Sequence, residues 1–107
     1  MIVSFETSEL HELCCKMEEA DNKFGHINAH DLIALIADIE AFDNVEELVE
    51  FLGNEATALD NDSLLIKFGS EHSLKFVAAG TKFDKDLDRV VWQSVQRLKL
   101  LQISELK

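Results

Sequence analysis

Five side chains that could act on a phosphate or a carboxylate stand in the second half of the chain. They are four cations and one histidine: Lys67, Lys75, Arg97, Lys99 and His72. Cations stabilise the negative charge that develops on a phosphate during cleavage, and a histidine can transfer protons near neutral pH. The cations alone could instead bind an acidic segment of another protein. The residue types therefore predict either RNA cleavage or the binding of an anionic partner.

The elements that would position these residues are strands, because the hydrophobic pattern takes a period of two from Ser63 onward. Residues 64–68, 74–78 and 95–103 are each typical of a strand. Successive side chains of a strand point to opposite faces of its sheet, so each cation opposes the apolar residues of its own strand. If those apolar residues meet helices, the four cations converge on the uncovered face. The alternative is an ordinary solvated face, where long cationic side chains cover apolar neighbours with their stems.

In the first half of the chain, apolar residues recur mostly at the spacing of a helix. After a short strand at Ile2–Phe5, an apolar stripe from Leu10 to Ala20, with Met17 in it, predicts a helix that ends near Gly25. Asn28 is expected to cap a second helix, which leaves His26 outside it. The stripe of this second helix runs from Leu32 to Phe42.

Asn44 is expected to cap a short third helix that ends at Gly53–Asn54. Residues 54–62 and 84–88 are expected to be loops, and Trp92 a core or edge anchor. These elements predict one α+β domain over residues 1–107, in the order β-α-α-(α)-β-β-β. Its sheet is expected to be antiparallel-rich, with a helical hairpin packed on one face.

Charge divides the chain into two unlike parts. Residues 1–62 carry a net charge of −14 and residues 63–107 a net charge of +3, within a total of −11. Such an acidic chain is not expected to bind nucleic acid over its whole surface. An acidic cluster of Asp43, Glu46, Glu47 and Glu50 is either a solvated helix face or a mimic of a phosphate track.

The remaining candidates for chemistry favour no metal and no cofactor. His26 and His30, four residues apart, are interpreted as a surface pair, and Cys14 as a buried thiol rather than a metal ligand beside His11. The adjacent cysteines are expected to be two buried thiols that stay reduced in a cytoplasmic protein. The first ten residues lack a basic segment, and no apolar run approaches the ~20 residues of a membrane-spanning helix, so we expect neither a secretory signal nor a membrane segment.

Three stretches, together with the order of elements, resemble the RelE/ParE toxin superfamily, in particular its plasmid-killer (HigB-like) branch. They are Met1–Phe5, His72–Phe76 and Val91–Ile103, the last being similar to the family's Asp-Trp-Ser-x-Val-x-x-Ile-x-Ile-Leu-x-Ile ending. The resemblance implies the family's fold over nearly the whole chain. Such toxins cut mRNA, usually on the ribosome, or inhibit gyrase, and each pairs with a cognate antitoxin.

The chain departs from the family where catalysis is expected. The family usually places Arg in the central strand and Tyr or His at the C-terminal end, whereas this chain has Lys75 in that strand, ends Ser104–Lys107 and contains no Tyr. The resemblance therefore implies a diverged toxin–antitoxin-type protein that binds a cognate antitoxin, or another protein, through its open sheet face. An mRNA endoribonuclease with His72 as acid/base, and an acidic nucleic-acid mimic, are the alternatives. Whether the chain forms a homodimer stays open.

Overall fold

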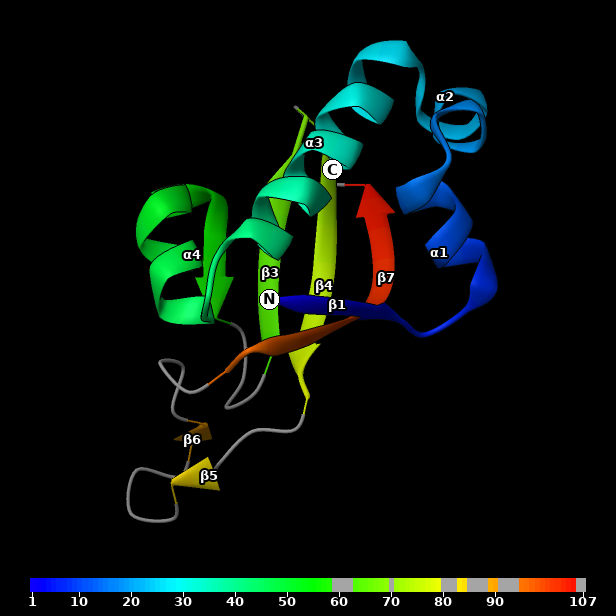
Figure 1. The fold of residues 1–107 in the computed structure, drawn as a ribbon. Coiled ribbons are helices and arrows are strands. Elements are labelled where there is room, and N and C mark those ends of the chain that lie inside the picture. Colours follow the sequence, from blue (N-terminus) through cyan, green and yellow to red (C-terminus); the bar gives the residue numbers. More distant parts are fainter. Residues whose placement is uncertain (59–62, 70, 80–82, 85–88, 91–94, 106–107) are drawn as a thin grey trace.

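A five-stranded mixed sheet in the order β1-β7-β4-β3-β2 forms the centre of the molecule (Figure 1). The computed structural model describes residues 1–58, 63–69, 71–79, 83–84, 89–90 and 95–105. The first strand is parallel to the last, and the other neighbouring pairs are antiparallel. The strands of this sheet are β1 (Ile2–Phe5), β2 (Ala56–Ala58), β3 (Ser63–Phe68), β4 (His72–Ala78) and β7 (Arg97–Glu105).

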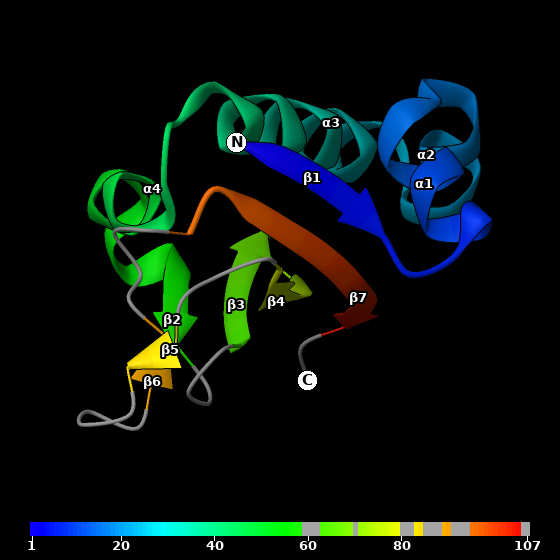
Figure 2. The same ribbon diagram turned by 60° about the horizontal axis from the view of Figure 1, so that its bottom comes forward.

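Helices α1 and α3 contact strands of this sheet on one face, α2 packs on α3 and α1, and the other face carries no helix (Figures 1 and 2). The fourth, α4, lies beside β2. The helices are α1 (Ser8–Cys15), α2 (Met17–Phe24), α3 (His26–Ala41) and α4 (Val45–Leu52). The expected α+β class is confirmed, and three of the four neighbouring strand pairs are antiparallel.

The helix expected across the stripe from Leu10 to Ala20 is in fact two helices that meet at Lys16. The backbone of Lys16 is extended, with φ −114° and ψ 113°, and this single residue turns the chain. The second helix, α2, then packs along α3, while α1 stays over β1 and β7. Met17, expected in the buried stripe, is 36% exposed as a result. Tertiary packing overrides the continuous helical spacing here, since no Gly or Pro marks the break.

The second long helix, α3, begins earlier than its expected cap. Gly25 precedes it with φ +85°, which glycine adopts readily, and His26 is already its first residue. Asn28 lies inside the first turn, where its side-chain amide donates to the carbonyl of Phe24 at 3.2 Å. The expectations that Asn28 caps this helix and that His26 lies outside it are therefore wrong.

The third expected helix, α4, matches its prediction. The side chain of Asn44 accepts a hydrogen bond from the amide of Glu47 at 3.0 Å, as an N-cap does. The described part of the segment expected to be a loop, residues 54–58, forms a 3-10 turn and a strand instead. A short 3-10 turn at Gly53–Glu55 leads into β2, which pairs with β3 from Ala58↔Leu64 to Ala56↔Ile66.

Strand pairing in the second half follows the expected period of two with one irregularity. The register between β4 and β7 shifts between Lys75 and Phe76, because Leu101 is an extra residue in β7. A small separate hairpin is formed by β5 (Phe83–Asp84) and β6 (Arg89–Val90), partly within a segment expected to be a loop. Trp92 and most of that segment lie outside the described residues.

Alternate residues of the strands meet the helices and form the core. These side chains are at most 4% exposed, and helices α3 and α4 pack their own apolar residues against them. The buried residues from the strands are Leu64, Ile66, Phe68, Leu74, Phe76, Leu98 and Leu100. The other set of alternate residues forms the face without helices, which we call the open face.

Candidate functional site

The open face carries the four cations of the candidate site. Strand register gives their arrangement: Lys67 pairs with Ser73, Lys75 with Leu65, and Lys99 with Val77. Arg97 lies two residues before Lys99 in β7 and therefore on the same face. Lys67, Lys75 and Lys99 form a diagonal row across the three central strands, β3, β4 and β7, and Arg97 lies beside Lys99 along β7.

These cations differ in their partners. The ammonium of Lys99 lies 2.8 Å from a carboxylate oxygen of Glu6, which follows β1. The other three, Lys67, Lys75 and Arg97, form no ion pair with any carboxylate of the described residues. Three unpaired cations on one face of a chain with a net charge of −11 are available to an anionic partner.

The centre of the open face is apolar. Leu65 and Val77 are diagonal neighbours on one side of Lys67, Lys75 and Lys99, with Arg97 beyond Val77, and both are half-buried. Ile2, opposite Arg97 in the register of β1, extends this apolar area and is 59% exposed. An apolar centre with a charged rim is the usual anatomy of a protein–protein contact. Sequence reasoning missed this centre, although the period of two already places Leu65 beside Lys67.

Serines, a threonine and a glutamine occupy most remaining positions of the open face. Among the described residues of this face no aromatic side chain occurs: Phe5, Phe68 and Phe76 all lie on the covered face. Single-stranded RNA is usually bound by stacking its bases on aromatic rings. The side-chain inventory of the described face therefore fits an acidic protein segment better than RNA.

His72 does not join the four cations. It pairs with Phe68 in the register of β3 and β4, and its ring stacks on that of Phe68 with centroids 5.1 Å apart. The ring of Phe24 packs edge-on against it at 5.2 Å, and His72 is 7% exposed. It thus lies on the covered face, across the sheet from Lys67 and Lys75. The geometry does not assemble the ribonuclease arrangement of His72 with these cations.

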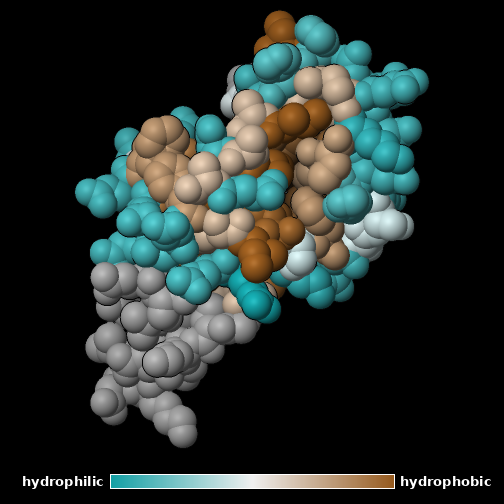
Figure 3. All heavy atoms as spheres, viewed as in Figure 1, coloured by the Kyte–Doolittle hydropathy of each residue, from teal (hydrophilic) through white to brown (hydrophobic). Residues whose placement is uncertain are grey.

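The helical side of the molecule is strongly acidic. Every Asp and Glu from Glu6 to Glu55 is exposed. Figure 3 shows hydrophilic side chains over the outer surfaces of α1, α2 and α4, with an apolar band between α3 and α1. Lys16 and Lys23 are the helical cations, and they pair with Glu12 and Glu9 at 3.6 and 3.9 Å. The acidic surface and the cationic open face are thus on different sides of the molecule.

The candidate metal ligands are dispersed. His26 and His30 are neighbours on α3 with ring centroids 6.3 Å apart, and His26 lies 3.7 Å from Asp21. His11 packs edge-on against Phe5, with ring centroids 5.1 Å apart. The described part of the chain contains no group of three side chains able to hold a metal ion.

Cys14 is a core residue, as expected, but Cys15, next to it, is exposed, so the expectation of two buried thiols is wrong for Cys15. Burial, and secondarily the neighbouring Cys15, raises the pKa of the Cys14 thiol from 9.0 to about 12. A thiol with such a pKa stays protonated and unreactive at neutral pH. Within the described helices none is both long and apolar enough to cross a membrane.

Comparison of the chain with protein-family models, with curated proteins and with solved structures finds no match. The resemblance to RelE/ParE toxins stays a prediction from the sequence.

Proposed function

We propose that this chain is a binding protein of a diverged toxin–antitoxin (RelE/HigB-like) type, which holds an acidic segment of a partner protein on its open sheet face. One observation carries the proposal. Lys67, Lys75 and Arg97 share a helix-free face with an apolar centre, and none pairs with a described carboxylate. The partner is a cognate antitoxin or another protein with acidic side chains around an apolar residue.

The affinity of such a contact would come from two sources. The partner's apolar residue would bury Leu65 and Val77, and its carboxylates would meet the surrounding cations. Arg97 can bind a carboxylate with two parallel hydrogen bonds, whereas the lysines act as point charges. Lys99 would contribute less than the other three, because its ammonium already lies against Glu6.

The test is a titration of the 15N-labelled chain with a short peptide of alternating glutamate and valine, followed by NMR. We expect amide shifts concentrated in β3, β4 and β7. Replacement of Lys67, Lys75, Arg97 and Lys99 by alanine should weaken binding by roughly tenfold or more, since each exposed charge pair contributes up to about 1 kcal/mol. The control replaces Lys16 and Lys23 of the acidic first half, which removes two charges rather than four, and it should bind like the parent chain.

Shifts that spread over the helices, or an unchanged affinity of the fourfold variant, would refute the proposal. The ribonuclease alternative has its own readout. Induced expression in a bacterial host, with growth and mRNA integrity followed together, should leave both unaffected. Growth arrest with mRNA breakage that the fourfold variant abolishes would instead identify a ribonuclease.

A second candidate function is an acidic mimic of nucleic acid that binds through its helices. The exposure of every acidic side chain from Glu6 to Glu55 favours it. Its test is competition with duplex DNA for a basic DNA-binding domain. Replacement of Glu46, Glu47 and Glu50 by glutamine should weaken the competition if this candidate is correct, and the fourfold cation variant should not.

A further inference from the structure

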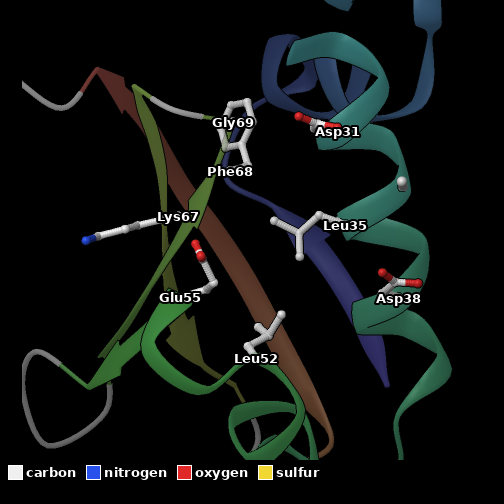
Figure 4. A pocket seen from close by; sticks show the side chains of 9 residues that line it. Asp31, Leu35, Asp38, Leu52, Glu55, Lys67, Phe68 and Gly69 are labelled. Atoms are coloured by element: carbon white, nitrogen blue, oxygen red, sulfur yellow. The ribbon is translucent and has the colours of Figure 1, made fainter. Parts of the chain in front are cut away.

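A groove lies at the edge of the molecule between α3 and β3, away from the open face. Its volume is about 440 Å³, within the range of sites that bind small ligands or single side chains. Leu35 from α3, Leu52 from α4 and Phe68 from β3 form its apolar floor, and Ala34 forms part of its wall. Figure 4 shows Leu35 and Leu52 pointing into the space between α3 and β3.

Carboxylates surround this apolar floor. Asp31 and Asp38 stand seven residues apart on α3, which is two turns and roughly 10.5 Å along the helix axis, so they share one side of it. Glu55 stands across the groove from them, next to β3. Lys67 also lines the groove, but its ammonium points away from it (Figure 4). No ion pair of the described residues neutralises these three carboxylates.

The end of β3 beyond its pairing with β2 forms the remaining wall, and the 3-10 turn at Gly53–Glu55 contacts β3 beside it. Strand β2 pairs with β3 only as far as Ile66, and Glu55 already belongs to the 3-10 turn before β2. In the described chain, Lys67 and Phe68 therefore have no strand beside them on the side of the groove. Exposed strand edges bind extended peptides by main-chain hydrogen bonds, which small organic cations cannot reproduce.

From these observations we infer that the groove binds an extended, basic segment of a partner protein. The segment runs along the free edge of β3 at Lys67 and Phe68. One lysine or arginine side chain inserts so that its aliphatic stem covers Leu35 and Leu52. Its cation then meets either Asp31 or Asp38, because the two carboxylates are too far apart along α3 for one cation to contact both. This surface is separate from the open face and has the opposite charge.

A peptide of alternating lysine and valine is the probe, titrated into the 15N-labelled full chain at 0.15 M salt, where distant charges are screened. We expect amide shifts in α3 between Asp31 and Asp38, and at Phe68 and Gly69. The double variant Asp31→Asn, Asp38→Asn should bind roughly tenfold more weakly, which corresponds to about 1.4 kcal/mol. The matched variant Glu46→Gln, Glu47→Gln removes the same charge from α4 and should bind like the parent chain.

Two further variants test the shape of the groove without a change of charge. Ala34 is exposed and lines the groove, so Ala34→Phe should fill it and abolish the shifts. Ala37 is equally exposed on α3 but lies outside the groove lining, so Ala37→Phe should leave binding intact. Both replaced alanines are surface residues, and circular dichroism verifies that each variant is folded.

Three outcomes would overturn the inference. Unchanged binding by the Ala34→Phe variant would show that the peptide lies elsewhere. Equal losses from the α3 and α4 charge variants would show attraction to the acidic surface as a whole. Equal affinity for free spermidine would show that the groove selects any linear amine rather than a peptide. Failure of this site leaves the proposed function untouched, because the open face is tested separately with the glutamate–valine peptide, whose proposed contacts do not include Asp31, Asp38 or Ala34.

Discussion

The two faces of the central sheet are built from the same strands and have opposite characters. In β3 the buried Phe68 follows the exposed Lys67, and in β4 the half-buried Lys75 stands between the buried Leu74 and Phe76. Side chains on the covered face must fit the helices above them, so their size and polarity are constrained by packing. Those on the open face meet no helix, and of its four cations Lys99 alone pairs with a carboxylate of the described residues. Alternate residues of each strand thus have different roles: those on the covered face stabilise the fold, and those on the open face are proposed to bind the partner.

The largest expected difference between the faces is in stability. Phe76 is fully buried, so Phe76→Ala should lower the free energy of unfolding by about 3–5 kcal/mol. Its neighbour Lys75 is on the open face, and Lys75→Ala should change the same quantity by less than about 0.5 kcal/mol. Urea unfolding followed by circular dichroism measures both. Similar losses for the two variants would contradict the division of the sheet.

His72 offers a sharper test because it is polar and yet lies on the covered face. His72→Ala removes the packing against Phe24 and Phe68, but it also removes a buried Nδ1 atom that has no hydrogen-bond partner. These effects oppose each other, so we expect a net loss of about 1–2 kcal/mol in the free energy of unfolding. The folded variant should bind the glutamate–valine peptide as the parent chain does. Weaker binding at equal stability would place His72 in the functional site.

The two adjacent cysteines of helix α1 also differ in burial: Cys14 is buried and Cys15 is exposed. Because the raised pKa of about 12 keeps Cys14 protonated, iodoacetamide at pH 8 should alkylate Cys15 alone in the folded chain and both thiols in urea. Mass spectrometry distinguishes the two products.

The same pKa predicts a loss of stability at alkaline pH. The unfolded chain releases the Cys14 proton near pH 9, whereas the folded chain retains it up to about pH 12. The folded state therefore binds more protons in this window, and the contribution of Cys14 to the free energy of unfolding falls as pH rises through it. A Cys14→Ala variant should lack this part of the pH dependence. Identical alkaline profiles would contradict the assignment.

The smallest expected effect on stability comes from the ion pair between Lys99 and Glu6 on the open face. The pair of Lys99 with Glu6 is exposed on both sides, and such pairs contribute about 0.2–1 kcal/mol. A double-mutant cycle with Lys99→Ala and Glu6→Gln should give a coupling within that range, and it should decrease at 1 M NaCl. A coupling that is large and independent of salt would mean that this part of the face is covered.

Much of the candidate face could be predicted from the sequence because strand alternation is a local property. The period of two in residues 64–68 and 74–78 is enough to put Lys67 and Lys75 opposite the apolar residues. The same rule placed no constraint on the pairing of Lys99 with Glu6, since that contact depends on β1 lying beside β7. The groove between α3 and β3 was also beyond sequence reasoning, because its lining comes from elements that meet only in the folded chain.

The helices show where local signals are reliable and where they are not. The cap at Asn44 was predicted correctly because a side chain and an amide three residues later decide it. The break at Lys16 was not predicted, because no residue near it requires a helix to end there. The start of α3 at His26 was not predicted either, because Gly25 permits the helix to begin directly after it, before Asn28.

By itself, the sequence determined the α+β class, the strand periods, the acidic first half and the identity of the cations, since each follows from residue type and short-range spacing. Tertiary structure decided three further things. The parallel pairing of β1 with β7 supplied Glu6 to Lys99, the packing of α2 on α3 bent the first helix, and the separation of His72 from the cations followed from strand register. All three depend on contacts between residues distant in the chain, for which a single sequence contains no local signal.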